Sequence, residues 1–138
     1  MSAETVHIRT FEWDDWDAVV GLWGAVGSSV LPQAEIEGTR RRTPELFLVA
    51  ETGSGVVAGA ALGTYDGRRG FILRLAVDPA QRRRGIARHL VAELEGRLRA
   101  LGCPRINLFV LPDNAAGLRF WQSLGYLPVP DVVHTKPL

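Results

Sequence analysis

Apolar and polar residues alternate or recur along the chain with the two periods that define strands and helices. Residues 71–77 are apolar on both sides of an extended segment, interrupted only by Arg74. This pattern is typical of a strand that is covered on both faces. From Ile86 to Leu101, apolar residues recur at helical spacing, and Gly102 then ends the predicted helix. The pattern here predicts a strand, a short connection and a helix.

The same two periods predict the other elements of the chain. Helices are expected at residues 14–26, 33–42 and 113–123. Strands are expected at residues 5–9, 46–51, 56–65, 105–111, 126–129 and 132–136. Helices and strands in this order predict the α/β class, with helices layered over one mixed sheet. At 138 residues, the chain is expected to be a single domain, residues 1–138.

A basic glycine turn, residues 82–87 (Arg-Arg-Arg-Gly-Ile-Ala), joins the central strand to the helix that follows it. Backbone N–H groups in the first turn of a helix have no intrahelical acceptor, and the helix dipole adds positive charge there. Arginine guanidinium groups nearby supply fixed charge and paired donors for a phosphate. The turn therefore predicts a phosphate site, while a solvated basic loop is the alternative interpretation.

Composition narrows the class of function. The formal net charge is only +1, from 16 basic and 15 acidic residues, so no strong field attracts nucleic acid or a membrane. Cys103 is the single cysteine, which fits a reducing compartment. No segment has the pattern of a signal peptide or a membrane span. We therefore expect a cytoplasmic protein, and the histidines and Cys103 are not spaced to bind a metal.

A second block of sequence, residues 114–126, contains Phe120-Trp121 and ends with Gly125-Tyr126. In this order and at this distance, the two blocks resemble the motifs of the GNAT superfamily of acyl-CoA-dependent N-acetyltransferases. The resemblance covers most of the chain and is closest to small single-domain bacterial members. It implies the acyl-CoA N-acyltransferase fold. In that fold a mixed, mostly antiparallel sheet splays between its fourth and fifth strands, with helices on both faces.

The resemblance also implies an activity. Such an enzyme transfers an acetyl group from acetyl-CoA, its cosubstrate, to a primary amine of a small molecule or a protein, by direct attack in a ternary complex. The residues that would hold the CoA diphosphate are Arg82, Arg83, Arg84, Gly85, Ile86, Ala87 and Arg88. Family members usually have glycine where this chain has Arg83, so the backbone here has less freedom.

Other positions that match the family would hold the pantetheine arm of CoA. The backbone of Leu75, Ala76 and Val77 would pair with its amides as an added strand does, and one N–H near Leu75 would donate to the thioester oxygen. Asn114 would hydrogen-bond to the arm, with Phe120 and Trp121 beside it. A helix cap is the alternative role for Asn114.

Proton transfer is less well defined by the sequence. Many family members have a tyrosine general acid at the position of Trp121, whose indole N–H has no useful acidity. Tyr126 is the remaining candidate acid, with core packing as its alternative. The candidate bases are Asp66 with its neighbour Tyr65, Glu35, Glu37 and His134. Each has an alternative role in a turn, on the surface or on a strand.

Three other functions stay open at this point. A non-catalytic acyl-CoA-binding module would tolerate Trp121. A nucleic-acid-binding domain would use the arginine triplets at residues 40–42 and 82–84, but it lacks a net basic charge. A nucleotide-binding fold would need Lys-Ser or Lys-Thr after the glycine turn, and neither is present. The acceptor is not encoded in such motifs, and a homodimer stays open.

Overall fold

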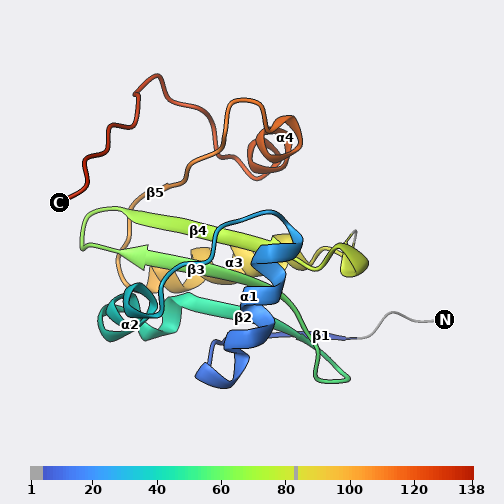
Figure 1. The fold of residues 1–138 in the computed structure, drawn as a ribbon. Coiled ribbons are helices and arrows are strands. Elements are labelled where there is room, and N and C mark those ends of the chain that lie inside the picture. Colours follow the sequence, from blue (N-terminus) through green and yellow to red (C-terminus); the bar gives the residue numbers. More distant parts are fainter. Residues whose placement is uncertain (1–4, 83) are drawn as a thin grey trace. The chain divides into compact units, whose positions relative to one another are not determined.

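In the part of the chain that the structure describes, five strands form one mixed sheet in the order β1-β2-β3-β4-β5 (Figure 1). The computed structural model describes residues 5–82 and 84–138, in two units, residues 5–108 and residues 109–138. The sheet belongs to the first unit. Its strands are β1 Val6–Thr10, β2 Phe47–Thr52, β3 Val57–Tyr65, β4 Gly70–Val77 and β5 Ile106–Asn107. Neighbouring strands are antiparallel from β1 to β4, whereas β4 and β5 are parallel.

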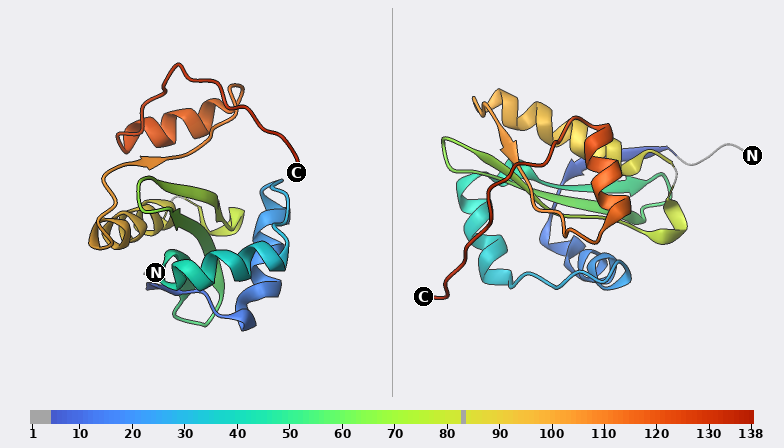
Figure 2. Two further views of the ribbon diagram at one scale, coloured as in Figure 1. Left: turned by 90° about the vertical axis from the view of Figure 1, so that its left-hand side faces the viewer. Right: turned by 90° about the horizontal axis from the view of Figure 1, so that it is seen from above.

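Helices cover both faces of this sheet. Figure 2 shows α3 (Ile86–Ala100) on one face and α1 (Trp16–Ala25) with α2 (Gln33–Arg42) on the other. Alternate residues of β2 explain the two layers, since Phe47 and Val49 join the core beneath α1 and α2. Between them, Leu48 is also fully buried. Short 3-10 turns precede α1, β2 and α3, at Trp13–Asp15, Pro44–Leu46 and Pro79–Gln81.

Glycines of β3 let α3 pack very close to the sheet. A Cβ atom at Gly59 would lie 3.1 Å from side-chain carbons of both Ile86 and Leu90. At Gly63 the corresponding distance to the Leu94 side chain is 3.0 Å. Such approaches are tighter than ordinary van der Waals contact, so larger residues would push the helix away. The position of α3 is therefore fixed by residues of β3 that have no side chain.

The pairing of β4 with β5 is short. Gly70 lies opposite Ile106, and Phe71 lies opposite Asn107, and this ladder goes no further. Among the described residues, β5 therefore leaves the edge of β4 without a partner strand beyond Phe71. This limited pairing agrees with the predicted separation of the fourth and fifth strands. Backbone groups at such an edge are available to a ligand.

The second unit contains α4 (Ala115–Ser123) and an extended C-terminal segment. The strand predicted at residues 105–111 is wrong apart from the two residues of β5, and those predicted at 126–129 and 132–136 are wrong. Pro128, inside residues 126–129, has no backbone N–H to give to a ladder, and among the described residues the other two segments pair with no strand beyond Ile106 and Asn107. The prediction of a single domain stays a prediction.

The predicted helices agree with the structure more closely than the predicted C-terminal strands do. The predicted helix at residues 33–42 coincides with α2, and the one at 14–26 appears as a 3-10 turn followed by α1. The helix predicted from Asp113 begins at Ala115, with Asn114 as its N-cap. Among the residues that the structure describes, no helix has the length and apolar character needed to cross a membrane.

Candidate functional site

The connection between β4 and α3 is anchored at both of its ends. The backbone N–H of Asp78 donates to the carbonyl of Ala58 on β3, at 2.8 Å. The Asp78 side chain then accepts a hydrogen bond of 3.0 Å from the N–H of Ala80, which caps the 3-10 turn Pro79–Gln81. The chain therefore leaves β4 in a defined direction and delivers the start of α3 close to the end of that strand.

Gly85 is the N-cap of α3 and has a left-handed backbone, with φ of 74°. The space where a Cβ would stand is open, since no heavy atom of the described residues other than its chain neighbours lies within 4 Å. The first intrahelical hydrogen bond runs from His89 N–H to the Gly85 carbonyl, at 3.0 Å, so the amides of Ile86 and Ala87 precede it. No acidic residue lies in the first helical turn. This helix start suits an anion.

Arginines surround this helix start. Arg82 and Arg88 are exposed, and the Arg84 guanidinium donates from Nη1 to the Gln81 side-chain oxygen. This hydrogen bond ties the Arg84 side chain to the end of the 3-10 turn Pro79–Gln81. Arg83, predicted to contribute an amide and a side chain, lies outside the described residues. The described arginines add fixed positive charge to the partial charge of the helix dipole.

A bulge interrupts β4 at Arg74 and Leu75, where the residues predicted to pair with the pantetheine arm begin. Ala60 pairs with Ala76 and Leu62 pairs with Leu73, so two residues of β4 face one residue of β3. One of those two is Arg74, whose φ is 54°. Bulges of this kind redirect backbone groups, and they are common beside active sites. The sequence signal was Arg74 itself, the one charged residue in an otherwise apolar strand.

Of the predicted arm-binding residues, Leu75 is the second residue of the bulge, and Ala76 and Val77 follow it directly. Ala76 is buried and lies opposite Ala60, whereas Leu75 and Val77 are half-buried. They belong to the part of β4 that β5 does not pair. The start of α3 lies close to Ala76, because a Cβ atom at Gly59 would contact both the Ile86 side chain and the carbonyl oxygen of Ala76. The helix start and the β4 edge thus lie side by side within the first unit.

Asp66 holds a turn. Its side-chain oxygen accepts hydrogen bonds of 2.7 Å from the N–H groups of both Arg68 and Arg69, and the carboxylate is fully exposed. These backbone donors hold the pKa of Asp66 below its ordinary value, which makes it a weaker base. The other base candidates of this unit, Glu35 and Glu37, are exposed on α2.

The remaining candidates lie in the second unit. Asn114 caps α4, since its Oδ1 accepts from the Gly117 N–H at 3.0 Å. The Trp121 ring makes edge contacts with Phe120 and with Tyr126, at centroid distances of 5.0 and 5.2 Å. Tyr126 is thus half-buried in an aromatic cluster, and its role as an acid stays a prediction. His134 is exposed, and its Nδ1 lies 3.0 Å from the Val132 carbonyl.

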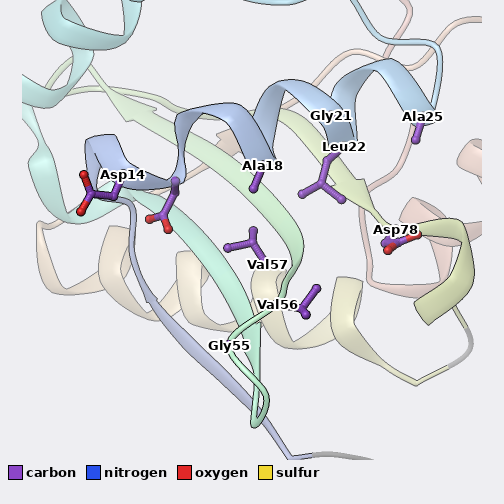
Figure 3. A pocket seen from close by; sticks show the side chains of 10 residues that line it. Asp14, Ala18, Gly21, Leu22, Ala25, Gly55, Val56, Val57 and Asp78 are labelled. Atoms are coloured by element: carbon purple, nitrogen blue, oxygen red, sulfur yellow. The ribbon is translucent and has the colours of Figure 1, made fainter.

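A groove of about 500 Å³ that the sequence pattern does not predict runs along α1 in the first unit (Figure 3). Its wall combines small and apolar side chains with carboxylates. The lining residues are Asp14, Asp15, Ala18, Gly21, Leu22, Ala25, Gly55, Val56, Val57 and Asp78. No local motif marks such a groove, because α1 and the β2–β3 turn are distant in the sequence. Within residues 5–82 and 84–138, no group of three His, Cys, Asp or Glu side chains is placed to hold a metal ion.

Known proteins share this arrangement. The acetyltransferase (GNAT) family matches residues 7–126 of the chain. An acetyltransferase of Sodalis glossinidius is 42% identical over 126 residues, covering 88% of this chain and 87% of that protein. An acetyltransferase of Pectobacterium atrosepticum is 40% identical over 138 residues, with 96% of each chain covered. The chain belongs to the GNAT acetyltransferase family. It is therefore an enzyme that depends on acetyl-CoA, an N-acetyltransferase.

Solved structures agree with this assignment. Ard1 from Thermoplasma volcanium is 28% identical, with a TM-score of 0.80 over 88% of this chain and 82% of that one. An aminoglycoside N-acetyltransferase in complex with CoA has a TM-score of 0.77 and covers 99% of this chain and 97% of its own. At 19% identity it shows the fold alone. The predicted acyl-CoA N-acyltransferase fold is confirmed.

Proposed function

We propose that this GNAT acetyltransferase moves the acetyl group of acetyl-CoA to a primary amine by direct attack in a ternary complex. The observation that carries the proposal is the open helix start at Gly85, lying beside the unpaired edge of β4. This arrangement offers one place for a diphosphate and another for an extended amide-bearing arm. Both belong to the first unit.

The diphosphate of CoA would lie on the backbone of residues 82–88. The N–H groups of Ile86 and Ala87 precede the first intrahelical bond, and the exposed side chains of Arg82 and Arg88 supply charge. Gly85 lets the phosphate approach, because a side chain there would occupy the open space. Backbone donors and arginines would both contribute to the affinity, and salt would screen the contribution of the exposed arginines.

The thioester would lie at the bulge of β4. Backbone groups of Leu75, Ala76 and Val77 would pair with the pantetheine amides, and the Leu75 N–H would donate to the thioester oxygen as negative charge develops. Asn114, Phe120 and Trp121, in the second unit, stay predicted CoA-binding residues on the strength of the family motif alone. Asn114 can cap α4 through one oxygen lone pair and still offer its NH2 group.

Proton balance limits which amines react well. The attacking amine must be neutral, the C–S bond breaks as the C–N bond forms, and the CoA sulfur leaves as a thiolate or thiol. A thiol with a pKa of about 8.5 is a tolerable leaving group without an acid. An α-amine, with a pKa of about 7.7–8.0, loses its proton far more easily than a lysine at about 10.4. We propose that Asp66 acts as a weak base through water. We propose Tyr126, whose ring contacts Trp121 in the second unit, as the candidate general acid.

Relatives of this fold carry different acceptors. One solved structure is a NatC complex bound to a Gag peptide and CoA, and another is the aminoglycoside enzyme above. We therefore keep both peptide and small-molecule amines as acceptors of this chain.

A cytoplasmic location is proposed from the single cysteine and the ordinary composition. No contact with nucleic acid or membranes is proposed, and a homodimer stays open.

The direct test is release of CoA thiol from acetyl-CoA in the presence of defined amines. The panel should contain amino acids, peptides with free N-termini, polyamines and aminoglycosides. At least one class should raise thiol release well above the rate without amine, with acetylated amine appearing in equal amount. Thiol release that no amine accelerates, together with CoA binding, would leave a binding module and contradict the proposal.

A further inference from the structure

We propose that Trp23, Arg74 and Ser29 act together as a clamp that fixes the β4 bulge, so that the Leu75 N–H is held ready for the thioester oxygen. The inference rests on the proposed function, because it assigns positioning residues to that same site. It concerns three side chains that neither motif of the sequence contains. The name "clamp" refers to these three residues only.

The bulge has a backbone conformation that its own residue does not favour. Arg74 is the only residue other than glycine with positive φ among those described, at 54°. A Cβ makes this left-handed region unfavourable for an arginine. Such a conformation persists only when its surroundings hold it in place. The contacts of Arg74 should therefore include those that hold the bulge.

Two elements hold Arg74, one through its backbone and one through its side chain. The indole Nε1 of Trp23 donates to the Arg74 carbonyl at 3.3 Å, and Trp23 is completely buried in the core beneath α1. The Arg74 guanidinium donates from Nε to the Ser29 carbonyl at 3.1 Å and from Nη2 to the Ser29 hydroxyl at 2.9 Å. Both partners are far away in sequence, on α1 and in the segment between α1 and α2.

The contact with Trp23 also sets the direction of the neighbouring amide. The Arg74 carbonyl and the Leu75 N–H belong to one planar trans peptide unit, in which the two groups point in opposite directions. A hydrogen bond that fixes the carbonyl toward Trp23 therefore fixes the Leu75 N–H toward the opposite side. Rotation of this peptide unit would misdirect the amide even if the strand stayed in place. The clamp is thus a device that prevents rotation.

Position matters here because a donor to a developing oxyanion acts over a narrow range of geometry. Removal of one such donor costs about 10²–10³ in kcat, and a misplacement of about 1 Å can cost about 10². CoA affinity depends mainly on the diphosphate and the arm, so it should change little. Loss of the clamp should consequently reduce kcat much more than it weakens CoA binding.

The test uses acetyl-CoA labelled with ¹³C at the thioester carbonyl and reads its stretching frequency by isotope-edited infrared spectroscopy. In the wild-type complex the band should lie below that of free acetyl-CoA, because the Leu75 N–H polarises the carbonyl. In Arg74→Ala and in Trp23→Phe, most of that shift should disappear, and kcat should fall at least about tenfold. The Kd of CoA should stay within about threefold of the wild-type value in both variants.

Ser29→Ala and the double variant Arg74→Ala/Ser29→Ala add a second measurement, which stands even if a core variant folds poorly. If the residues act as one unit, the double variant should be no worse than Arg74→Ala alone. Arg42→Ala, at the exposed end of α2, is the matched control and should keep both the band and kcat. CoA binding with an unshifted wild-type band, or a shift that survives in Arg74→Ala and Trp23→Phe, would overturn the clamp. A wild type that does not bind CoA would instead contradict the proposed function.

Discussion

At the scale of single residues, Gly85 and Gly102 form a matched pair at the two ends of α3. Both have positive φ, 74° and 90°, and both have open space where a Cβ would stand. Valine should therefore strain either position equally, by about 1–2 kcal/mol. Only Gly85→Val should also block the diphosphate, so its Kd for CoA should rise at least about tenfold in calorimetric titration. Similar affinities for the two variants would contradict the assignment of the helix start.

Asp15 makes stability depend on pH. It accepts two hydrogen bonds from Arg9, at 2.8 and 2.9 Å, and is 7% exposed, so the guanidinium and the N–H of Glu12 hold its pKa below the ordinary value. A depressed pKa stabilises the fold above the unfolded carboxyl pKa of about 3.9, and this contribution is lost as the pH falls through the lower folded pKa.

Asp15→Asn should therefore lower the free energy of unfolding by about 2 kcal/mol at pH 7, measured with urea. The difference from the wild type should shrink as the pH falls below about 4. Asp17→Asn, exposed on α1, serves as the control and should change little. A gap between wild type and Asp15→Asn that stays constant down to about pH 3 would refute the role of the ion pair.

Substitutions of Trp121 test whether the enzyme lacks a general acid for the departing CoA sulfur. A phenol at this position, in Trp121→Tyr, can give a proton to the departing sulfur, which an indole cannot. We expect kcat to rise about tenfold or more in the thiol-release assay. Trp121→Phe provides an aromatic ring without a proton and should show no gain. Equal rates for the tyrosine and phenylalanine variants would mean that departure of the sulfur needs no acid.

At the scale of elements, substitutions at two glycines of β3 can distinguish the effect of overpacking on stability from its effect on the position of the α3 start. Gly59 contacts the first turn of the helix through Ile86, whereas Gly63 contacts its middle through Leu94. Gly59→Val and Gly63→Val should each cost about 1–3 kcal/mol by overpacking. Gly59→Val should weaken CoA binding more, since it moves the start of the helix. The check is thermal unfolding together with the Kd of CoA, and equal losses of affinity would contradict this division.

Elements with a complete local pattern were predictable, and elements that depend on a distant partner were not. The helix at residues 33–42 and the strand–turn–helix around Gly85 follow from periodicity and turn chemistry alone. Strand formation at residues 105–111 requires a partner, and β4 supplies one over only two residues. The bulge was visible only as an odd arginine, because Trp23 and Ser29 reach Arg74 from 51 and 45 residues away.

At the scale of the whole molecule, the first unit carries both the helix start and the β4 edge, and the family match extends from residue 7 to residue 126. CoA should therefore stabilise the folded chain. At a concentration of about 100 times its Kd, a ligand of the folded state alone adds about 2.7 kcal/mol. The melting temperature should rise with CoA in the wild type and much less in Gly85→Val. An unchanged melting temperature in the wild type would contradict CoA binding.

Because the donors at the start of α3 are backbone N–H groups, the sequence of this segment can change during evolution without loss of those donors. Every residue except proline carries the same N–H, so substitutions around Gly85 can alter surface charge without deleting a donor. Mutational drift in this segment should thus be wide, limited by backbone conformation rather than by side-chain identity.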